Sequence, residues 1–194
     1  MPTILHLPGW QNSGPTHWLS RWENRYAHQR VQQHDWMHPL RGDWVARLED
    51  VLLAQTQPVI LVAHSLGCQL VAAWAAHSRN THRVSAALLV APGDTESEQL
   101  QSVLKSWSPV VLRALPFTSM LLASHNDPWC SFARAAHFAQ AWGAELLDWG
   151  HCGHINADSG LGDWPEGHAV LERLQARIHS PSPPPAQPPS PPDI

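Results

Sequence analysis

The chain has 194 residues, with 12 basic side chains, 16 acidic side chains and a formal net charge of −4. A chain of this length can bury about 70% of its unfolded surface around one core, and it is too short for two comfortable domains. Its basic residues are scattered and form no positive stripe, so we expect no nucleic-acid partner.

Short apolar runs alternate with segments of helical period, which predicts a mostly parallel sheet covered by helices. We expect strands at Thr3–Leu7, Val31–Asp35, Val59–Ala63, Val84–Val90, Thr118–Ala123 and Glu145–Asp148. Five helices are expected: one opening at Pro15–His17 with Trp18, Leu19, Trp22 and Tyr26 on one face, one carrying Trp44, Leu48, Val51 and Leu52, one starting after Ser65, one over Phe132–Trp142, and one over Glu166–Ile178.

Two segments depart from this rhythm. Residues 95–116 fit it poorly and contain the break Trp107-Ser108-Pro109, so they are a candidate cap or pocket wall. Ser180–Ile194 contains eight prolines, which is typical of a disordered polyproline II tail. This tail is either a docking peptide for a proline-reading domain or a segment without function. We therefore divide the chain into a folded domain, 1–179, and a Pro-rich tail, 180–194.

The cysteines and the N-terminus indicate the compartment. Cys68, Cys130 and Cys152 are odd in number and form no Cys-x-x-Cys pair, which is typical of reduced cytosolic proteins. The first residues carry no basic and apolar signal segment, and no run of about eighteen apolar residues could span a membrane. We expect a cytoplasmic protein that does not bind membranes.

The motif that carries most information follows the third predicted strand, where an apolar run ends in Ala63-His64-Ser65-Leu66-Gly67. A serine on a sharp strand-to-helix turn needs small residues two positions before and after it, as in the Gly-x-Ser-x-Gly nucleophile elbow. Ala63 departs from that pattern by one methyl group. The alternative is an ordinary strand-turn-helix joint, in which Ser65 only caps the helix.

Candidates for an acid and a base follow later strands. Reactive groups gather at the carboxyl ends of parallel strands, and Asp127 lies in the turn after the fifth predicted strand. The alternative is that Asp127 only forms the turn before Pro128. Asp94 and Asp148 are rival acids. The loop after the sixth strand offers two histidines, of which His154 is the first choice and His151 the fallback.

The order serine, acid, histidine is that of the α/β-hydrolases. Residues 8–18, 63–67 and 153–167 resemble the small serine hydrolases related to retinoblastoma-binding protein nine, and the match spans most of residues 1–179. This resemblance implies a compact α/β-hydrolase of about six strands, with helices on both faces and little or no lid. It also implies that Ser65, Asp127 and His154 are the catalytic triad.

Two features depart from the pattern of that family. Pro8 stands where many relatives have a histidine before the Gly-Trp pair. The family's name refers to binding of the retinoblastoma pocket through Leu-x-Cys-x-Glu, whereas this chain has Leu66-Gly67-Cys68-Gln69-Leu70, without the glutamate. That binding role is therefore not expected here.

The expected chemistry is hydrolysis of small carboxylic esters, or of amides or short peptides, through an acyl-Ser65 intermediate and without a cofactor. His154 would move the proton and Asp127 would orient the imidazole. The N–H of Leu66 and an N–H of the Gly9-Trp10 loop would bind the oxyanion. Three tryptophans could wall an apolar acyl pocket, or could equally well pack in the core, since the chain has eleven tryptophans: Trp10, Trp107 and Trp129.

Two other classes of function stay open. A metalloenzyme could use His151, Cys152 and His154, although the loop lacks a second ligand pair at zinc spacing. A catalytically weak α/β-hydrolase could instead serve as a protein-binding module.

Overall fold

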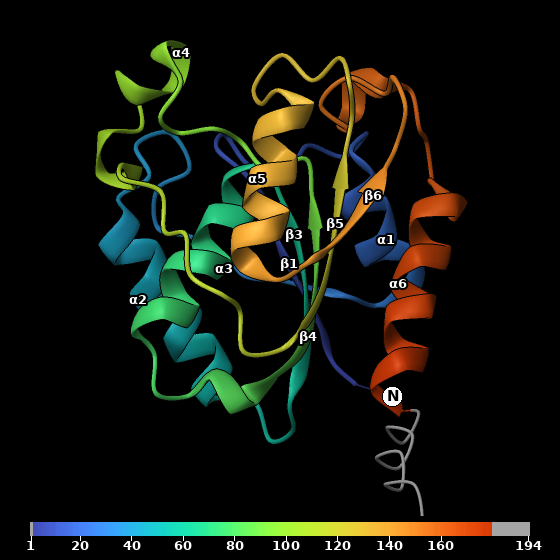
Figure 1. The fold of residues 1–194 in the computed structure, drawn as a ribbon. Helices are drawn as coiled ribbons and strands as arrows, with labels where there is room; N and C mark the ends of the chain where they lie inside the picture. The colour runs from blue at the N-terminus through green and yellow to red at the C-terminus, as the bar shows by residue number, and fades with distance from the viewer. Residues whose placement is uncertain (1, 180–194) are drawn as a thin grey trace, which may run out of the picture.

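The computed structural model describes residues 2–179. Within that range, six strands form one all-parallel sheet in the order β2-β1-β3-β4-β5-β6 (Figure 1). The strands are β1 (Ile4–Leu7), β2 (Gln29–Arg30), β3 (Val59–His64), β4 (Val84–Val90), β5 (Thr118–Ala123) and β6 (Glu145–Asp148). The predicted Pro-rich tail lies outside the described residues.

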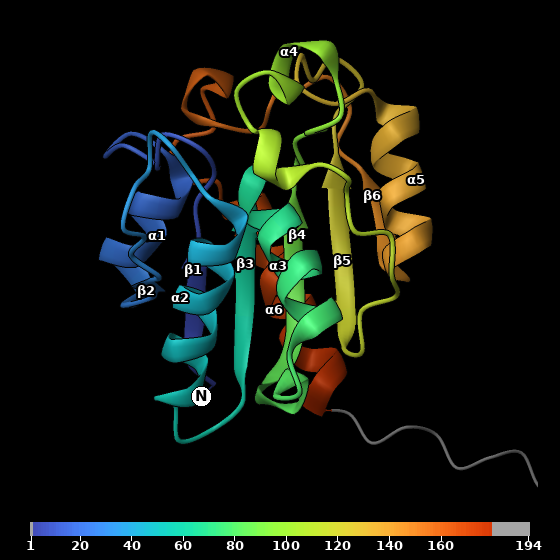
Figure 2. The same cartoon turned by 90° about the vertical axis from the view of Figure 1, so that its left-hand side faces the viewer.

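Helices cover both faces of the sheet. Figures 1 and 2 show α1 and α6 on one face and α2, α3 and α5 on the other. Their bounds are α1 (Trp18–Tyr26), α2 (Arg41–Leu53), α3 (Leu66–His77), α5 (Phe132–Trp142) and α6 (Pro165–His179). The predicted fold class is therefore confirmed. In addition, none of the helices in residues 2–179 combines the length and apolar character needed to cross a membrane.

The central strands are buried on both faces, which explains why they read as unbroken apolar runs. All six residues of β3 are buried. Alternate side chains of this strand enter two separate cores, Leu61 and Ala63 under α2, α3 and α5, and Ile60 and Val62 under α1 and α6. This double burial fixes the end of β3, where Ser65 follows.

Gly67 sets how closely α3 approaches β1. A Cβ atom at this position would lie 2.1 Å from the carbonyl oxygen of Leu7, so any side chain would push the helix away from the strand. The glycine two residues after Ser65 is therefore required by packing. It brings the N-terminus of α3 beside the loop that follows β1.

The second predicted strand was misplaced. Val31–Asp35 was expected, but the strand is Gln29–Arg30, which pairs with Leu5 and His6 of β1. Val31 still donates its N–H to the His6 carbonyl. Pro8 follows β1 and has no N–H with which to extend the ladder, so the edge strand ends early. Asp35 instead accepts hydrogen bonds from the backbone N–H groups of Met37 and His38 in a turn.

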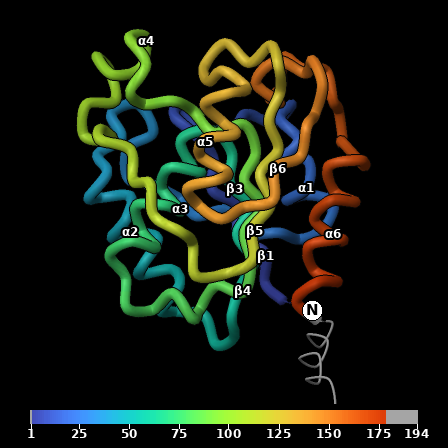
Figure 3. The backbone as a smooth tube through the Cα atoms, viewed as in Figure 1, coloured from blue at the N-terminus to red at the C-terminus, as the bar shows by residue number. Residues whose placement is uncertain are grey.

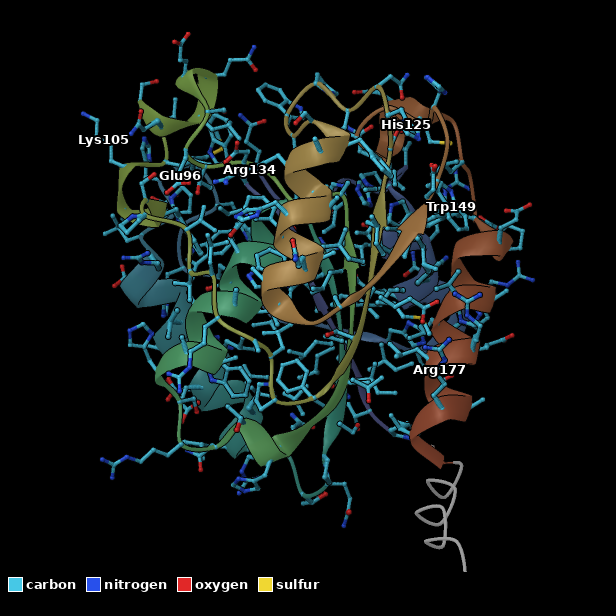
Figure 4. The ribbon with its side chains drawn as sticks, viewed as in Figure 1. Glu96, Lys105, His125, Arg134, Trp149 and Arg177 are labelled. Atoms are coloured by element: carbon cyan, nitrogen blue, oxygen red, sulfur yellow. The ribbon has the colours of Figure 1, made fainter. Side chains whose placement is uncertain are left out.

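The insertion between β4 and β5 contains the helix α4 (Glu98–Gln101) and the 3-10 turn η2 (Lys105–Trp107). Figure 2 shows α4 above the carboxyl ends of the strands, and the tube in Figure 3 returns from there along the outside of the molecule to the start of β5. Arg134 of α5 forms ion pairs with Asp94 and Glu96, which hold the base of this insertion. Figure 4 labels Arg134 and Glu96, which lie side by side there. The insertion is therefore tied to the body of the domain.

Candidate active site

Ser65 lies on the turn between β3 and α3 with φ 55° and ψ −118°. A residue with a side chain rarely adopts this conformation, and such strain persists only where the surrounding structure imposes it. The Ser65 side chain makes no cap hydrogen bond to α3. Its Oγ lies 2.9 Å from Nε2 of His154 instead. The interpretation of Ser65 as a simple helix cap is therefore wrong.

His154 connects Ser65 to Asp127. Its Nδ1 lies 2.8 Å from Oδ2 and 2.9 Å from Oδ1 of Asp127, so Nδ1 carries the proton and Nε2 is free to accept one from Ser65. The side chains of His154 and Asp127 are 8% and 3% exposed, which shields both contacts from water. Asp127 also accepts the backbone N–H of Trp129 at 2.9 Å. The structure thus brings together the three residues chosen from the sequence.

The rival residues are engaged elsewhere. Asp94 pairs with Arg134, Nε to Oδ2, at 3.3 Å. Asp148 lies 2.8 Å from Nε2 of His125 on the surface. The ring of His151 stacks on that of His125, with 5.5 Å between centroids. None of the three rivals contacts Ser65 or His154 among the hydrogen bonds of the described residues.

The trio considered for a metal site is not arranged to bind one. Both ring nitrogens of His154 are occupied by Asp127 and Ser65. Within residues 2–179, no group of three His, Cys, Asp or Glu side chains could hold a metal ion. The three cysteines are free, and Cys68 is buried.

A cavity of about 540 Å³ opens at Ser65. Its apolar wall consists of Trp10, Leu66, Leu100, Leu104 and Trp129, of which Leu100 and Leu104 come from the insertion. The insertion is therefore a pocket wall, as predicted. Trp107 is not, because it is 1% exposed in the core and donates its Nε1–H to the Pro39 carbonyl.

The cavity also has polar lining residues, which include Asn12, Ser13, His17, Asn156 and Asp158. No lysine or arginine lines the cavity among the described residues. Among the described lining residues, Asp158 is the one carboxylate, and the lining also contains His17, His64 and His154. The described lining thus combines apolar with polar side chains and contains no lysine or arginine to bind an anionic group.

Main-chain donors lie beside Ser65 on two sides. Leu66 begins α3, where the first N–H groups have no acceptor within the helix. On the other side, a Cβ atom at Gly9 would be 2.7 Å from Cβ and 3.2 Å from Oγ of Ser65. The Gly9-Trp10 backbone therefore passes directly against the serine. The N–H of Gln11 is not a free donor here, because it already donates to the Trp36 carbonyl.

The residues that anchor the His154 loop were not recognised in the sequence. Cys152 N–H donates to Ser124 Oγ and Gly153 N–H to Asn126 Oδ1, both at 2.8 Å. His64 Nε2 lies 2.9 Å from the His154 carbonyl, and Trp18 Nε1–H donates to the Ile155 carbonyl at 2.7 Å. The one feature of the sequence that could have pointed to His64 and Asn126 is that they directly precede Ser65 and Asp127.

Two buried histidines lie beside this site. His17 accepts the Leu19 N–H at Nδ1 and so caps α1. Burial, together with the charges that His154 and Arg30 can carry, lowers the pKa of His17 to about 3. Burial also lowers the pKa of His64 well below its usual range, helped by His17 and His154. Both rings are therefore neutral at neutral pH.

Stability should fall in mild acid because of these buried rings. Histidine in an unfolded chain titrates near pH 6.5. Between about pH 6.5 and the pKa of about 3 for His17, the unfolded chain binds a proton that the folded chain does not. The free energy of unfolding is therefore highest above pH 6.5 and decreases as the pH falls below it. Urea unfolding at a series of pH values measures this decrease.

The matched variant is His17→Asn, whose side-chain oxygen can still cap α1 but does not titrate. We expect a smaller loss of stability between about pH 6.5 and 4 than in the native chain. Some loss will remain, since burial lowers the pKa of His6 and His28 as well. Equal slopes in the two proteins would contradict a contribution from His17.

The sheet, its helices and the site at the carboxyl end of β3 define an α/β-hydrolase. The same fold occurs in a YdeN-like hydrolase from Pectobacterium atrosepticum, with a TM-score of 0.80 and 34% identity over 92% of each chain. The ydeN gene product of B. subtilis has a TM-score of 0.73 and 20% identity, over 91% of this chain and 100% of that one.

A third neighbour, Est1E from Butyrivibrio proteoclasticus with bound ferulic acid, has a TM-score of 0.71 and 12% identity over 93% of this chain and 90% of that one. The two neighbours below 25% identity support the fold alone. The serine hydrolase family model matches residues 4–173, and the chain belongs to this family. No curated protein sequence matches the chain.

Proposed function

We propose that the protein hydrolyses small carboxylic esters with Ser65 as nucleophile, His154 as general base and acid, and Asp127 as the group that orients His154. The observation that carries this proposal is the chain of short contacts from Ser65 Oγ to His154 Nε2 and from His154 Nδ1 to Asp127, at 2.9 Å and 2.8 Å. The strained turn at Ser65 supports its role as a nucleophile elbow.

In the acylation step, Ser65 Oγ attacks the ester carbonyl carbon and its proton passes to His154 Nε2. The negative charge that develops on the carbonyl oxygen is stabilised by the N–H of Leu66, at the start of α3, and by the N–H of Trp10, which follows Gly9 beside Ser65. The carbon–oxygen bond to the alcohol then breaks, and His154 gives its proton to the departing alcohol. Asp127 stabilises the charged imidazole between these two transfers.

In the deacylation step, water takes the place of the alcohol. The water oxygen attacks the acyl carbon while His154 removes a proton from the water. The bond between the acyl carbon and Ser65 Oγ then breaks. The proton returns through His154 to Ser65, and a carboxylic acid leaves. Besides the ester and this water molecule, both steps use only groups of this chain.

The apolar and polar lining residues suggest how a substrate lies in the cavity. The acyl chain would pack against Leu100, Leu104 and Trp129, and the polar residues Asn12 and Asn156 would face the alcohol. A volume of about 540 Å³ suits a small molecule rather than a long acyl chain. The absence of a basic side chain from the described lining favours neutral substrates over anionic ones.

We also propose a narrower family relation and a cellular location for the protein. The relation to hydrolases of the retinoblastoma-binding protein nine type is supported by the motifs in residues 8–18, 63–67 and 153–167. A cytoplasmic location is supported by the three free cysteines of the described chain.

The experiment that tests the proposal is covalent labelling of the native chain with a fluorophosphonate, followed by intact-mass measurement and peptide mapping. We expect one adduct, at Ser65, and complete loss of hydrolysis of aryl acetate and butyrate esters. A chelator should leave the activity unchanged, and aryl dodecanoate should be hydrolysed much more slowly than butyrate. Activity that a chelator abolishes, with no adduct at Ser65, would show that the proposal is wrong.

A further inference from the structure

The residues that precede Ser65 and Asp127 both bind the backbone beside His154. His64 Nε2 lies 2.9 Å from the carbonyl oxygen of His154. Asn126 Oδ1 accepts the N–H of Gly153 at 2.8 Å. Ser65 and Asp127 thus contact the imidazole of His154, while the residue before each of them, His64 and Asn126, contacts the main chain beside that imidazole.

We propose that His64 and Asn126 are positioning residues, which fix the backbone at residues 153 and 154 so that the His154 imidazole lies within hydrogen-bond distance of both Ser65 and Asp127. This inference rests on the proposed function. It adds two residues that act through the backbone of the His154 loop, although His64 also belongs to the cavity lining.

His64 can form only one arrangement with His154. The carbonyl oxygen is an acceptor, so Nε2 of His64 must carry the proton and donate it. The ring is 5% exposed and packs against the rings of His154 and His17, each with 4.8 Å between centroids. Contacts with two other imidazole rings therefore restrict its position. A neutral ring here also adds no positive charge beside His154 when His154 takes a proton.

Asn126 belongs to a second set of contacts, which joins the loop after β5 to the His154 loop. Its Oδ1 accepts the hydroxyl of Ser124 at 2.8 Å as well as the N–H of Gly153. The Ser124 oxygen in turn accepts the N–H of Cys152 at 2.8 Å. Two successive N–H groups are thereby fixed from the segment that carries Asp127.

The loop needs such contacts because its backbone is strained next to His154. Ile155 has φ 46°, a conformation that a β-branched residue avoids. Its side chain is fully buried, and its carbonyl accepts the Nε1–H of Trp18 at 2.7 Å. A strained residue keeps its conformation only when its surroundings determine it fully. Loss of a neighbouring contact should therefore let the His154 backbone move.

The test compares variants that remove each contact with variants that keep it. His64→Leu and Asn126→Ala should each lower kcat for aryl butyrate by about ten- to a hundredfold with little change in KM, since small displacements of a catalytic group have effects of that order. His64→Gln keeps a donor and Asn126→Asp keeps an acceptor, so both should recover most of the activity. The rate of fluorophosphonate labelling should change in parallel.

A second measurement separates positioning from a general loss of structure. In a His154→Gln background there is no imidazole to position, so His64→Leu and Asn126→Ala should not lower the residual rate further. Trp22→Phe is the matched control, because it removes a similar bond, from Trp22 Nε1–H to the Asp163 carbonyl at 2.8 Å, at the far end of the same loop. It should lower Tm and leave kcat unchanged.

The outcomes distinguish this inference from the proposed function. If His154→Gln abolishes activity but His64→Leu and Asn126→Ala retain full kcat, the positioning role is wrong and the proposed function stands. If His154→Gln itself is harmless, the proposed function is wrong. Should His64→Leu fail to fold, Asn126→Ala decides alone, because Asn126 is exposed and its loss opens no cavity.

Discussion

Ser65→Ala is expected to abolish fluorophosphonate labelling and to lower kcat for ester hydrolysis by about a million-fold, the order of loss found when a serine nucleophile is removed. The reason is that Ser65 Oγ is the one hydroxyl at 2.9 Å from His154 Nε2 in the described structure. The protein should still fold, because the Ser65 side chain does not cap α3.

Ser85→Ala is the matched control for this variant. Ser85 lies at the opposite end of the sheet, where its hydroxyl donates to the Val59 carbonyl at 3.0 Å. The Ser85→Ala variant should still be labelled by the fluorophosphonate, at Ser65, and should hydrolyse esters at the native rate. Labelling that persists in Ser65→Ala, with circular dichroism showing a native fold, would mean that the reactive group lies elsewhere.

The sequence predicts the central strands and the Ser65 turn well because their signals are local. The residues of β3 are apolar without interruption, since both faces of the strand are buried. The small residues around Ser65 also follow from one local requirement, which at Gly67 is the close approach of the Leu7 carbonyl. Such features depend on a few adjacent residues and can be predicted without knowledge of the rest of the fold.

The wrong predictions concern residues whose structure depends on contacts with other helices, strands or loops. The misplaced edge strand depends on where β1 stops, at Leu7 before Pro8, rather than on the composition of Val31–Asp35 itself. Similarly, Trp107 and Trp129 are equally apolar, but the insertion turns Trp107 toward Pro39 and leaves Trp129 at the cavity. Apolar composition alone cannot distinguish a core tryptophan from a pocket wall.

The contacts that hold the His154 loop were invisible for a related reason. Trp18 and Ile155 are 137 residues apart in the sequence, and His64 and His154 are 90 apart. A tryptophan on an apolar helix face predicts burial, but nothing in that pattern predicts which carbonyl its N–H will meet. These long-range bonds become apparent only when α1, β3 and the loop after β6 are assembled.

The choice of acid has the second largest expected effect. Asp127→Asn should lower kcat by roughly ten-thousand-fold, because an amide beside Nδ1 favours the wrong imidazole tautomer and cannot stabilise the charged ring. The shape of the side chain is retained, so Tm should change little. KM should also change little, since Asp127 is not among the residues that line the cavity.

Asp94→Asn and Asp148→Asn are the comparisons that make this assignment decisive. Asp94 pairs with Arg134 at the base of the insertion, so its amide variant should loosen the wall that carries Leu100 and raise KM by a modest factor. Asp148 is on the surface, where its contact with His125 contributes little. If Asp94→Asn is instead the crippling change and Asp127→Asn stays active, the acid comes from the loop after β4. The 2.8 Å contact between Asp127 and His154 would then have to serve only to hold the loop.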